Sequence, residues 1–376
     1  MSQIHQLIMP KWGLSMHQGT VTRWLVEEGA RIERGMEVLD VETEKIANAI
    51  ESNVSGMLRR KVVQGGDIVP VSGLLGIVAE PDVPDAEIDA FVADFLASFV
   101  PPTAEDEATG AKPEKIEVAG RSLRYLKRGD GGMPVILVHG FGGDLNNWLF
   151  NHEALAAKRS VYALDLPAHG ESSKKLERGD LAEFAEVLEA FMDALGINQA
   201  HLVGHSMGGA VILQLASSNP AKAKSLTLIS SAGLGEEINA DYIEGFVSSK
   251  SRGEIKPHLQ KLFADPALVT RQLIDDMLKY KRLDGVDDAL KTVASKLFAN
   301  GKQATILSDK LVVLDVPVLI IWGQEDGIIS ASHALNLPSL VSVHILPGKG
   351  HMVQMEAATE VNRLIENFLE PVLRTG

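Results

Sequence analysis

The first 80 residues of the chain repeat themselves at an offset of 37 residues, and this repeat limits the possible fold more than any other feature. Glycine recurs at Gly19 and Gly56, and again at Gly29 and Gly66. Apolar residues recur at the same offset. Val21 corresponds to Leu58, Leu25 and Val26 to Val62 and Val63, Ile32 to Val69, Val38 to Leu75, and Val41 to Val78. Glycine tolerates the backbone of tight turns, and apolar residues at such positions are typical of strands that face a core. The repeat predicts a small all-β sandwich whose two halves are related by a pseudo-twofold axis.

The segment that joins the two halves, residues 40–47, contains Lys45. By the pseudosymmetry, this turn lies at the end of the sandwich opposite the paired ends of the domain. We therefore expect Lys45 to be exposed and accessible to a modifying enzyme.

Residues 9–16 (MPKWGLSM), followed by Gly19, Thr20 and Val21, resemble the opening of a lipoyl domain of a 2-oxo-acid-type dehydrogenase complex. That family attaches lipoate to a lysine of the central hairpin, with a glycine eleven residues later, and Lys45 and Gly56 have this spacing. The related biotinyl domains carry methionine on both sides of the lysine, whereas Lys45 lies between Glu44 and Ile46. The resemblance covers residues 4 to about 80 and implies that a lipoyl-attaching enzyme links lipoate to Lys45.

Residues 81–115 form an acidic, proline-rich linker. Inside it, Ile88, Phe91, Val92, Phe95, Leu96 and Phe99 recur with helical spacing, which predicts an amphipathic helix over residues 85–99. We expect this helix to pack on the catalytic domain that follows it; the alternative is a docking helix for another subunit. The linker does not resemble the basic subunit-binding domain usual in such acyltransferases. Residues 100–115 are predicted to be a tether of at most about 55 Å.

From residue 116 to residue 376, β-rich apolar runs alternate with amphipathic segments such as residues 181–195. This alternation predicts a mostly parallel sheet with helices on both faces. The apolar runs cover residues 135–138, 161–164, 201–203, 226–229, 318–321 and 343–346.

The motif with most chemical meaning is residues 204–208 (GHSMG), which fit G-x-S-x-G after a strand and before a helix. A serine hydroxyl needs a base before it becomes nucleophilic at neutral pH. His351 and Asp326 each follow a predicted strand, and the order Ser206, Asp326, His351 is that of the α/β-hydrolase fold. We predict Ser206 as nucleophile, His351 as base and Asp326 as the acid that orients it. Glu325 is the rival acid.

Residues 139–143 (HGFGG) follow a strand and resemble the oxyanion loop of the α/β-hydrolase family. The backbone N–H groups of Phe141 and Met207 are therefore the expected oxyanion donors. His139, His169 and His205 are assigned structural or pocket roles. By analogy with this fold, the helical pattern at about residues 235–314 forms a cap over the pocket.

Together the two parts resemble the dihydrolipoyllysine-residue acetyltransferase (E2) component of a bacterial acetoin dehydrogenase complex. The resemblance implies a multidomain chain: a lipoyl domain (1–80), a linker (81–115) and an α/β-hydrolase-fold domain (116–376). It also implies acetyl transfer from dihydrolipoyl-Lys45 to coenzyme A through a Ser206 acyl-enzyme. The implied partners are a thiamine-diphosphate-dependent E1 and the flavin enzyme dihydrolipoamide dehydrogenase. The H-x-x-x-D-G motif of the usual acyltransferase core is absent from the sequence.

Three other interpretations remain open at this point. His351 could activate coenzyme A for direct attack on the lipoyl thioester, without Ser206 as nucleophile. The chain could be a serine (thio)esterase-type hydrolase to which the lipoyl domain delivers substrate. The hydrolase fold could also be an inert scaffold for the carrier domain.

Charge and composition exclude several other classes of function. The formal net charge of −14 disfavours binding of nucleic acid or anionic membranes, and no apolar run reaches the roughly 18 to 20 residues of a membrane span. The absence of cysteine excludes disulfides and thiolate metal sites. No histidine–carboxylate cluster has metal-ligand spacing, and no signal peptide is evident. We expect a cytoplasmic homo-oligomer without a catalytic metal.

Overall fold

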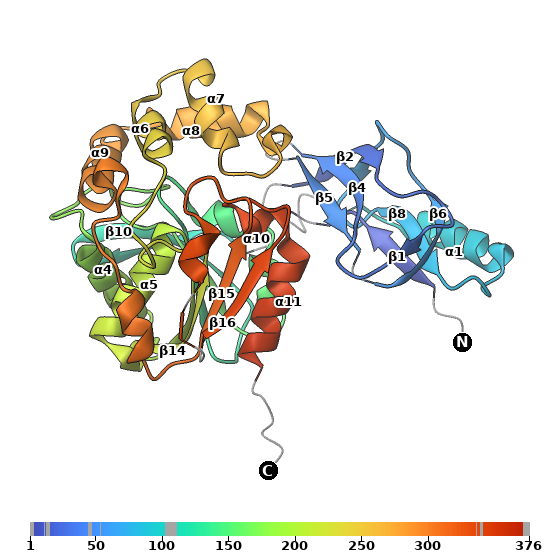
Figure 1. The fold of residues 1–376 in the computed structure, drawn as a ribbon. Coiled ribbons are helices and arrows are strands. Elements are labelled where there is room, and N and C mark those ends of the chain that lie inside the picture. Colours follow the sequence, from blue (N-terminus) through green and yellow to red (C-terminus); the bar gives the residue numbers. More distant parts are fainter. Residues whose placement is uncertain are drawn as a thin grey trace, which may run out of the picture. The chain divides into compact units, whose positions relative to one another are not determined.

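The computed structural model of the chain describes residues 4–10, 12, 16–43, 47–52, 54–101, 111–335, 337–338 and 341–370. The chain forms two compact units, Met1–Gly110 and Ala111–Gly376, called here the first and second domain. In Figure 1 the first domain runs from blue to cyan and the second from cyan through green to red. No helix in these described residues is long and apolar enough to cross a membrane.

The first domain is a sandwich of two four-stranded sheets, as the repeat predicts. The strand orders are β1-β8-β6-β3 and β5-β4-β2-β7. The strands are β1 (His5–Ile8), β2 (Gln18–Trp24), β3 (Arg31–Ile32), β4 (Glu37–Glu42), β5 (Ala47–Glu51), β6 (Gly56–Lys61), β7 (Ile68–Pro70) and β8 (Leu74–Ala79).

The 37-residue repeat relates the two sheets to each other. Exchanging β2, β3 and β4 with β6, β7 and β8 converts the order β4-β2-β7 into β8-β6-β3. Each half therefore lends its short middle strand to the sheet of the other half, since β3 pairs with β6 and β7 pairs with β2. This exchange confirms the predicted pseudosymmetry and ties the two halves into one core.

Gly19 and Gly56 occupy equivalent positions in the two halves. A Cβ atom on Gly19 would lie 2.6 Å from Val41 Cγ1, and one on Gly56 would lie 2.8 Å from Val78 Cγ1. These two valines are themselves a repeat pair, and both are fully buried. Glycine is needed at both positions because each strand approaches a core valine too closely for a side chain.

The hairpin of β4 and β5 joins the two halves of the repeat. Its antiparallel register pairs Glu42 with Ala47, and Lys45 belongs to the four residues between them. Lys45, with its neighbours Glu44 and Ile46, lies outside the described residues.

Helix α1 (Asp85–Ser98) confirms the helix predicted in the linker, but it packs on the first domain. Ile88 is fully buried in a cluster with residues of β8 and its following turn: Leu74, Ile77, Ala79 and Val83. Strand β8 is thus buried on both faces, because Leu75 and Val78 point into the sandwich. The helix contacts its own chain, on the domain that precedes it rather than on the one that follows it as expected.

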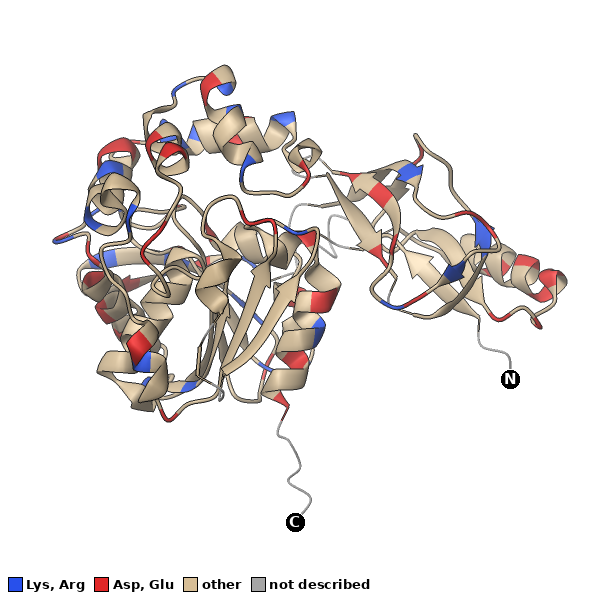
Figure 2. Cartoon of the chain, viewed as in Figure 1, with Lys and Arg blue, Asp and Glu red and all other residues tan. Residues whose placement is uncertain are grey.

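Charge complementarity adds to this packing. Arg59 donates a hydrogen bond to Asp85 at 2.8 Å, and Arg60 donates one to Asp89 at 2.6 Å. Arg59 also donates to the backbone oxygens of Glu80 and Val83, at 2.7 and 3.0 Å. Figure 2 marks the acidic positions along α1 in red. The basic end of β6 therefore holds the acidic first turns of the helix.

The second domain contains an eight-stranded sheet of order β16-β15-β14-β13-β11-β12-β10-β9. Its strands from β16 to β12 run parallel, and β10 and β9 form an antiparallel edge. The strands are β9 (Glu114–Val118), β10 (Arg121–Arg128), β11 (Val135–Val138), β12 (Val161–Leu164), β13 (Ala200–His205), β14 (Ala223–Ile229), β15 (Val318–Gly323) and β16 (Val341–Leu346). The β9–β10 hairpin was not predicted, and β9 includes the last two residues of the predicted tether.

Helices cover both faces of this sheet, with α4 and α5 on one side and α11 on the other (Figure 1). They are α3 (His152–Ala156), α4 (Leu181–Ala194), α5 (Met207–Ser218), α10 (Val353–Glu356) and α11 (Ala358–Leu369). Four more helices lie between β14 and β15, where the cap was expected: α6 (Ala240–Ser248), α7 (Arg252–Gln260), α8 (Arg271–Lys281) and α9 (Val286–Leu297). This arrangement confirms the predicted α/β-hydrolase fold.

The packing of α1 leads to a prediction for Ile88→Ala. The substitution leaves a cavity against β8 and should destabilise the first domain by about 2 to 5 kcal/mol. Hydrogen exchange of the full chain should then rise in β6, β8 and α1 but remain unchanged in the second domain. The control is Leu96→Ala, which alters a side chain on the same helix that is 56% exposed. Faster exchange in the second domain would contradict the assignment of this helix.

Candidate active site

Ser206 lies on a sharp turn between β13 and α5. Its backbone has φ = 53° and ψ = −120°, a strained conformation for a residue with a side chain. The turn is held by its neighbours, because the Ser206 N–H donates to Ile229 O at 2.9 Å and the Ala232 N–H donates to Ser206 O at 3.0 Å. A Cβ on Gly204 would collide with the Gly208 backbone, and one on Gly208 with the carbonyl groups of Val138 and His139. Both glycines of the motif are therefore required by close backbone approach.

His351 and Asp326 are in direct contact. His351 Nδ1 donates to Asp326 Oδ2 at 2.8 Å, and both side chains are almost completely buried. Asp326 is held in turn by the Trp322 indole N–H at 3.0 Å and by the N–H groups of Ile328 and Ile329 at 2.8 and 3.0 Å. The rival acid Glu325 is exposed. Of the two neighbouring acids, Asp326 is the one that can orient the imidazole.

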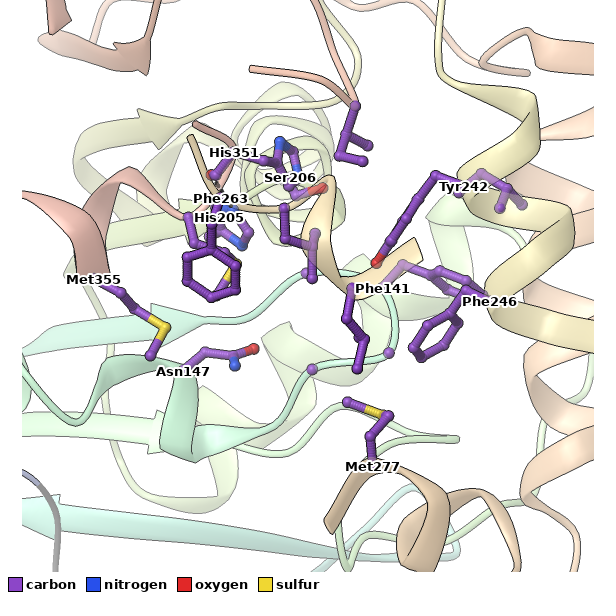
Figure 3. A pocket seen from close by; sticks show the side chains of 18 of the residues that line it. Phe141, Asn147, His205, Ser206, Tyr242, Phe246, Phe263, Met277, His351 and Met355 are labelled. Atoms are coloured by element: carbon purple, nitrogen blue, oxygen red, sulfur yellow. Dashed lines mark hydrogen bonds between the residues drawn. The ribbon is translucent and has the colours of Figure 1, made fainter. Parts of the chain in front are cut away.

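Ser206 and His351 line the same pocket, as Figure 3 shows. Within the described residues, no hydrogen bond joins Ser206 Oγ to His351 Nε2. Catalytic hydrogen bonds of this kind are often long in unliganded sites and shorten when substrate binds. The structure thus brings the three predicted residues to one place, with the acid–base contact already made.

The predicted oxyanion loop runs directly beside the serine. A Cβ on Gly140 would lie 2.9 Å from Ser206 Cβ. In the described part of the chain, neither the Phe141 N–H nor the Met207 N–H donates to a backbone carbonyl. Met207 is the first residue of α5, where N–H groups have no partner within the helix. Both donors are therefore available to a ligand in the pocket.

The other histidines near the site form hydrogen bonds with backbone groups. His139 Nδ1 donates to Gly140 O at 2.8 Å, and its Nε2 accepts from the Leu166 N–H at 3.0 Å. Burial lowers the pKa of His139 to about 4, so the ring stays neutral and fixes the backbone of the predicted oxyanion loop. His205 donates to His351 O at 2.9 Å, and His169 donates to Pro167 O at 2.8 Å. Burial also lowers the pKa of each of these two rings, which suits structural roles rather than a base.

The pocket above Ser206 is largely apolar. Its cavity volume is about 80 Å³, several times what one buried water needs. The cap supplies much of its wall, and the rings of Phe246 and Phe298 pack 5.7 and 5.8 Å from that of Phe141. Other apolar lining residues are Ile243, Leu259, Leu262, Phe263, Leu273 and Met277. The wall of the pocket beside Ser206 is therefore mainly apolar.

Sequence reasoning missed Glu356, a buried carboxylate that links the His351 loop to the cap. Glu356 accepts from the Gly350 N–H and from the Ala264 N–H, both at 2.9 Å. A further bond runs from the Met352 N–H to Leu262 O at 3.0 Å. The only sequence signal was a single acidic residue in an apolar segment, and such a residue is usually exposed.

The buried position of Glu356 predicts a pH-dependent stability. Burial raises the pKa of Glu356 to about 7, above the ordinary value near 4.5, so the folded chain keeps a proton that the unfolded chain loses. The contribution of this group to the free energy of unfolding should therefore fall as pH rises from about 5 to 8, by up to about 3 kcal/mol. Glu356→Gln has no such ionisation. Denaturant unfolding of both chains should show that the free energy of unfolding of the wild type falls relative to that of the variant as pH rises. A constant difference between the two free energies would contradict the prediction.

Comparison with known proteins agrees with this architecture. The α/β-hydrolase-fold family matches residues 133–358, and the biotin/lipoyl family, described as biotin-requiring enzyme, matches residues 5–78. A crystal structure of a meta-cleavage product hydrolase from Pseudomonas fluorescens is 24% identical with a TM-score of 0.63, covering 68% of this chain and 96% of that one. This likeness shows the fold alone.

Two curated relatives match nearly the whole chain. A protein of Pseudomonas putida, named dihydrolipoyllysine-residue acetyltransferase component of acetoin cleaving system, is 54% identical over 98% of this chain and 99% of its own length. A protein of Cupriavidus necator with the same name is 47% identical over 96% of each chain. With its lipoyl domain and α/β-hydrolase-fold domain, the chain belongs to the family of dihydrolipoyllysine-residue acetyltransferase components of acetoin cleaving systems.

Proposed function

We propose that the chain transfers an acetyl group from dihydrolipoyl-Lys45 to coenzyme A, through an acyl-enzyme on Ser206. The observation that carries the proposal is the presence, on one chain, of a lipoyl domain and a serine pocket with a contacting histidine–aspartate pair. A carrier domain needs an enzyme that accepts its cargo, and an activated serine can hold an acyl group as an ester. The names of the two full-length relatives support the same reaction.

Lys45 is the residue proposed to hold lipoate. It falls within the four residues that β4 and β5 enclose, in the hairpin that joins the two halves of the repeat. When attached there and reduced, the lipoyl group would supply a thiol able to carry the acetyl group as a thioester.

The chemistry of the second domain follows from its own residues. His351 takes the proton from Ser206 Oγ, and the oxygen attacks the thioester carbonyl carbon. The N–H groups of Phe141 and Met207 stabilise the resulting oxyanion. When the carbon–sulfur bond breaks, His351 returns the proton to the leaving thiol, and the acetyl group remains on Ser206.

The second half of the reaction reverses these steps with a new thiol. His351 takes the proton from the coenzyme A thiol, whose sulfur attacks the acetyl ester. The carbon–oxygen bond breaks, and Ser206 Oγ regains its proton from His351. Water is the competing acceptor, so the apolar wall contributed by the cap favours transfer over hydrolysis.

The proposal includes partners for the lipoyl domain. A thiamine-diphosphate-dependent E1 loads the lipoyl group, and dihydrolipoamide dehydrogenase reoxidises it afterwards. A lipoyl-attaching enzyme modifies Lys45, and the chain assembles as a homo-oligomer. The name of the relatives, as components of a cleaving system, supports an assembly of several enzymes.

Ser206→Ala tests the nucleophile. The purified chain is given acetyl-dihydrolipoamide with and without coenzyme A, and acetyl-coenzyme A and acetate are quantified. We expect acetyl-coenzyme A as the main product, and a loss of about 10³-fold or more in the variant because the acyl-enzyme cannot form. Substantial transfer by the variant would instead support direct attack by coenzyme A activated by His351. Acetate as the main product, independent of coenzyme A, would make the chain a hydrolase.

Asp326→Asn and Glu325→Gln form a matched pair that tests the acid. The asparagine cannot stabilise the positive charge of His351, so acetyl transfer should fall by about 10³- to 10⁴-fold. Glu325→Gln changes an exposed neighbour and should leave the rate near that of the wild type. Steady-state rates of acetyl-coenzyme A formation compare the two variants. Equal losses would rule out a specific role of Asp326.

A further inference from the structure

Tyr242 is a polar residue in an otherwise mainly apolar wall of the cap. The chain has four tyrosines. Tyr125 donates its hydroxyl hydrogen bond to Glu114 at 3.0 Å, and Tyr280 donates to Ala168 O at 2.9 Å. Tyr242 is only 5% exposed, yet its hydroxyl has no hydrogen-bond partner among the described residues, and it points into the pocket (Figure 3). A phenol hydroxyl that is open to a pocket and has no partner in the chain is free to donate to a ligand bound there.

Helix α6 holds Tyr242 beside the oxyanion loop. Tyr242 and Phe246 lie four residues apart on one face of the helix, with ring centroids 5.9 Å apart. The Phe246 ring contacts the oxyanion loop directly, because a Cβ on Gly142 would lie 2.5 Å from that ring. The same ring packs 5.7 Å from the ring of Phe141.

Both ends of α6 are anchored, which fixes the position of this face. At its start, Asn239 accepts from the Tyr242 N–H at 2.9 Å and donates to Gly327 O at 2.7 Å, in the loop that carries Asp326. At its end, the buried Lys281 ammonium donates to the carbonyl oxygens of Phe246 and Val247, at 2.6 and 3.1 Å. Tyr242 is therefore held between the oxyanion loop and the loop of the catalytic acid.

The hydroxyl is suited to donate a hydrogen bond. Burial raises the pKa of Tyr242 above its ordinary value near 10, so the phenol keeps its proton at neutral pH. The methyl group of an acetyl substrate offers no acceptor. The carbonyl oxygen does, and it gains negative charge next to Phe141 as the tetrahedral intermediate forms.

We propose that the Tyr242 hydroxyl is a third donor to this oxygen, beside the N–H groups of Phe141 and Met207. The inference rests on the proposed function and adds a catalytic residue to it. Donors aimed at the developing oxyanion act mainly on the rate of the chemical step, because they contribute more in the transition state than in the bound substrate.

Tyr242→Phe in the full-length chain tests this role, since it removes the hydroxyl and keeps the ring. Two reactions are measured: acylation of Ser206 by p-nitrophenyl acetate, from the burst of p-nitrophenolate, and acetyl transfer from acetyl-dihydrolipoamide to coenzyme A. We expect both rates to fall by about 10- to 100-fold, while the KM for coenzyme A stays unchanged. Binding of a boronic acid, whose tetrahedral adduct on Ser206 mimics the intermediate, should weaken by a similar factor.

Tyr125→Phe is the matched control, because it removes a phenolic hydroxyl on strand β10, outside the pocket. It should leave both rates unchanged. A raised KM for coenzyme A with normal acylation in Tyr242→Phe would overturn the inference, because the hydroxyl would then bind the acceptor thiol arm. Unchanged kinetics would overturn it as well. Failure of the proposed function would look different, since the wild type would then show no acylation that Ser206→Ala abolishes.

Discussion

The strained turn at Ser206 is the constraint on which the proposed active site depends. A positive φ at a residue with a side chain costs free energy, and it persists only where the surroundings determine it fully. Here the surroundings are the ends of parallel strands. Ile229 at the end of β14 accepts from the Ser206 N–H, and Ala232, just after β14, donates to the Ser206 carbonyl oxygen. The glycines of the motif let the neighbouring backbones approach, and Gly140 lets the proposed oxyanion loop pack against the serine. The site is thus built where several strand ends converge.

The cap is tied to this centre through polar contacts that the site itself does not use for chemistry. Glu356 links the segment around His351 to the cap at Ala264, and Asn239 links the start of α6 to the loop of Asp326. Lys281 fixes the other end of α6. The contacts of Glu356 and Lys281 bury a charged group, which is favourable only when its hydrogen bonds are satisfied. Together they connect the apolar wall of the pocket to the two loops that carry His351 and Asp326.

The first domain is held together by the burial of apolar strand faces. Its core comes from two small halves that exchange strands, and its β8 strand has a second apolar face that would otherwise be exposed. Helix α1 covers this face, while the arginines of β6 hold its acidic turns. The helix is therefore part of the carrier domain, and the linker between the two domains is shorter than the sequence pattern indicates.

The sequence by itself determined the two folds, the order Ser206, Asp326, His351 and the position of Lys45 in the joining hairpin. These features depend on local signals: repeated glycines, alternating apolar runs and motifs at strand ends. Only the tertiary structure decided where α1 packs, because an amphipathic stripe predicts burial without naming the surface that buries it. The unbroken apolar run of β8 (LLGIVA) was a signal for that surface. Likewise, Glu356 lies far in sequence from Ala264, and Tyr242 lies far from the loop of Gly140 and Phe141. Their burial therefore depends on the packing of the cap over the sheet.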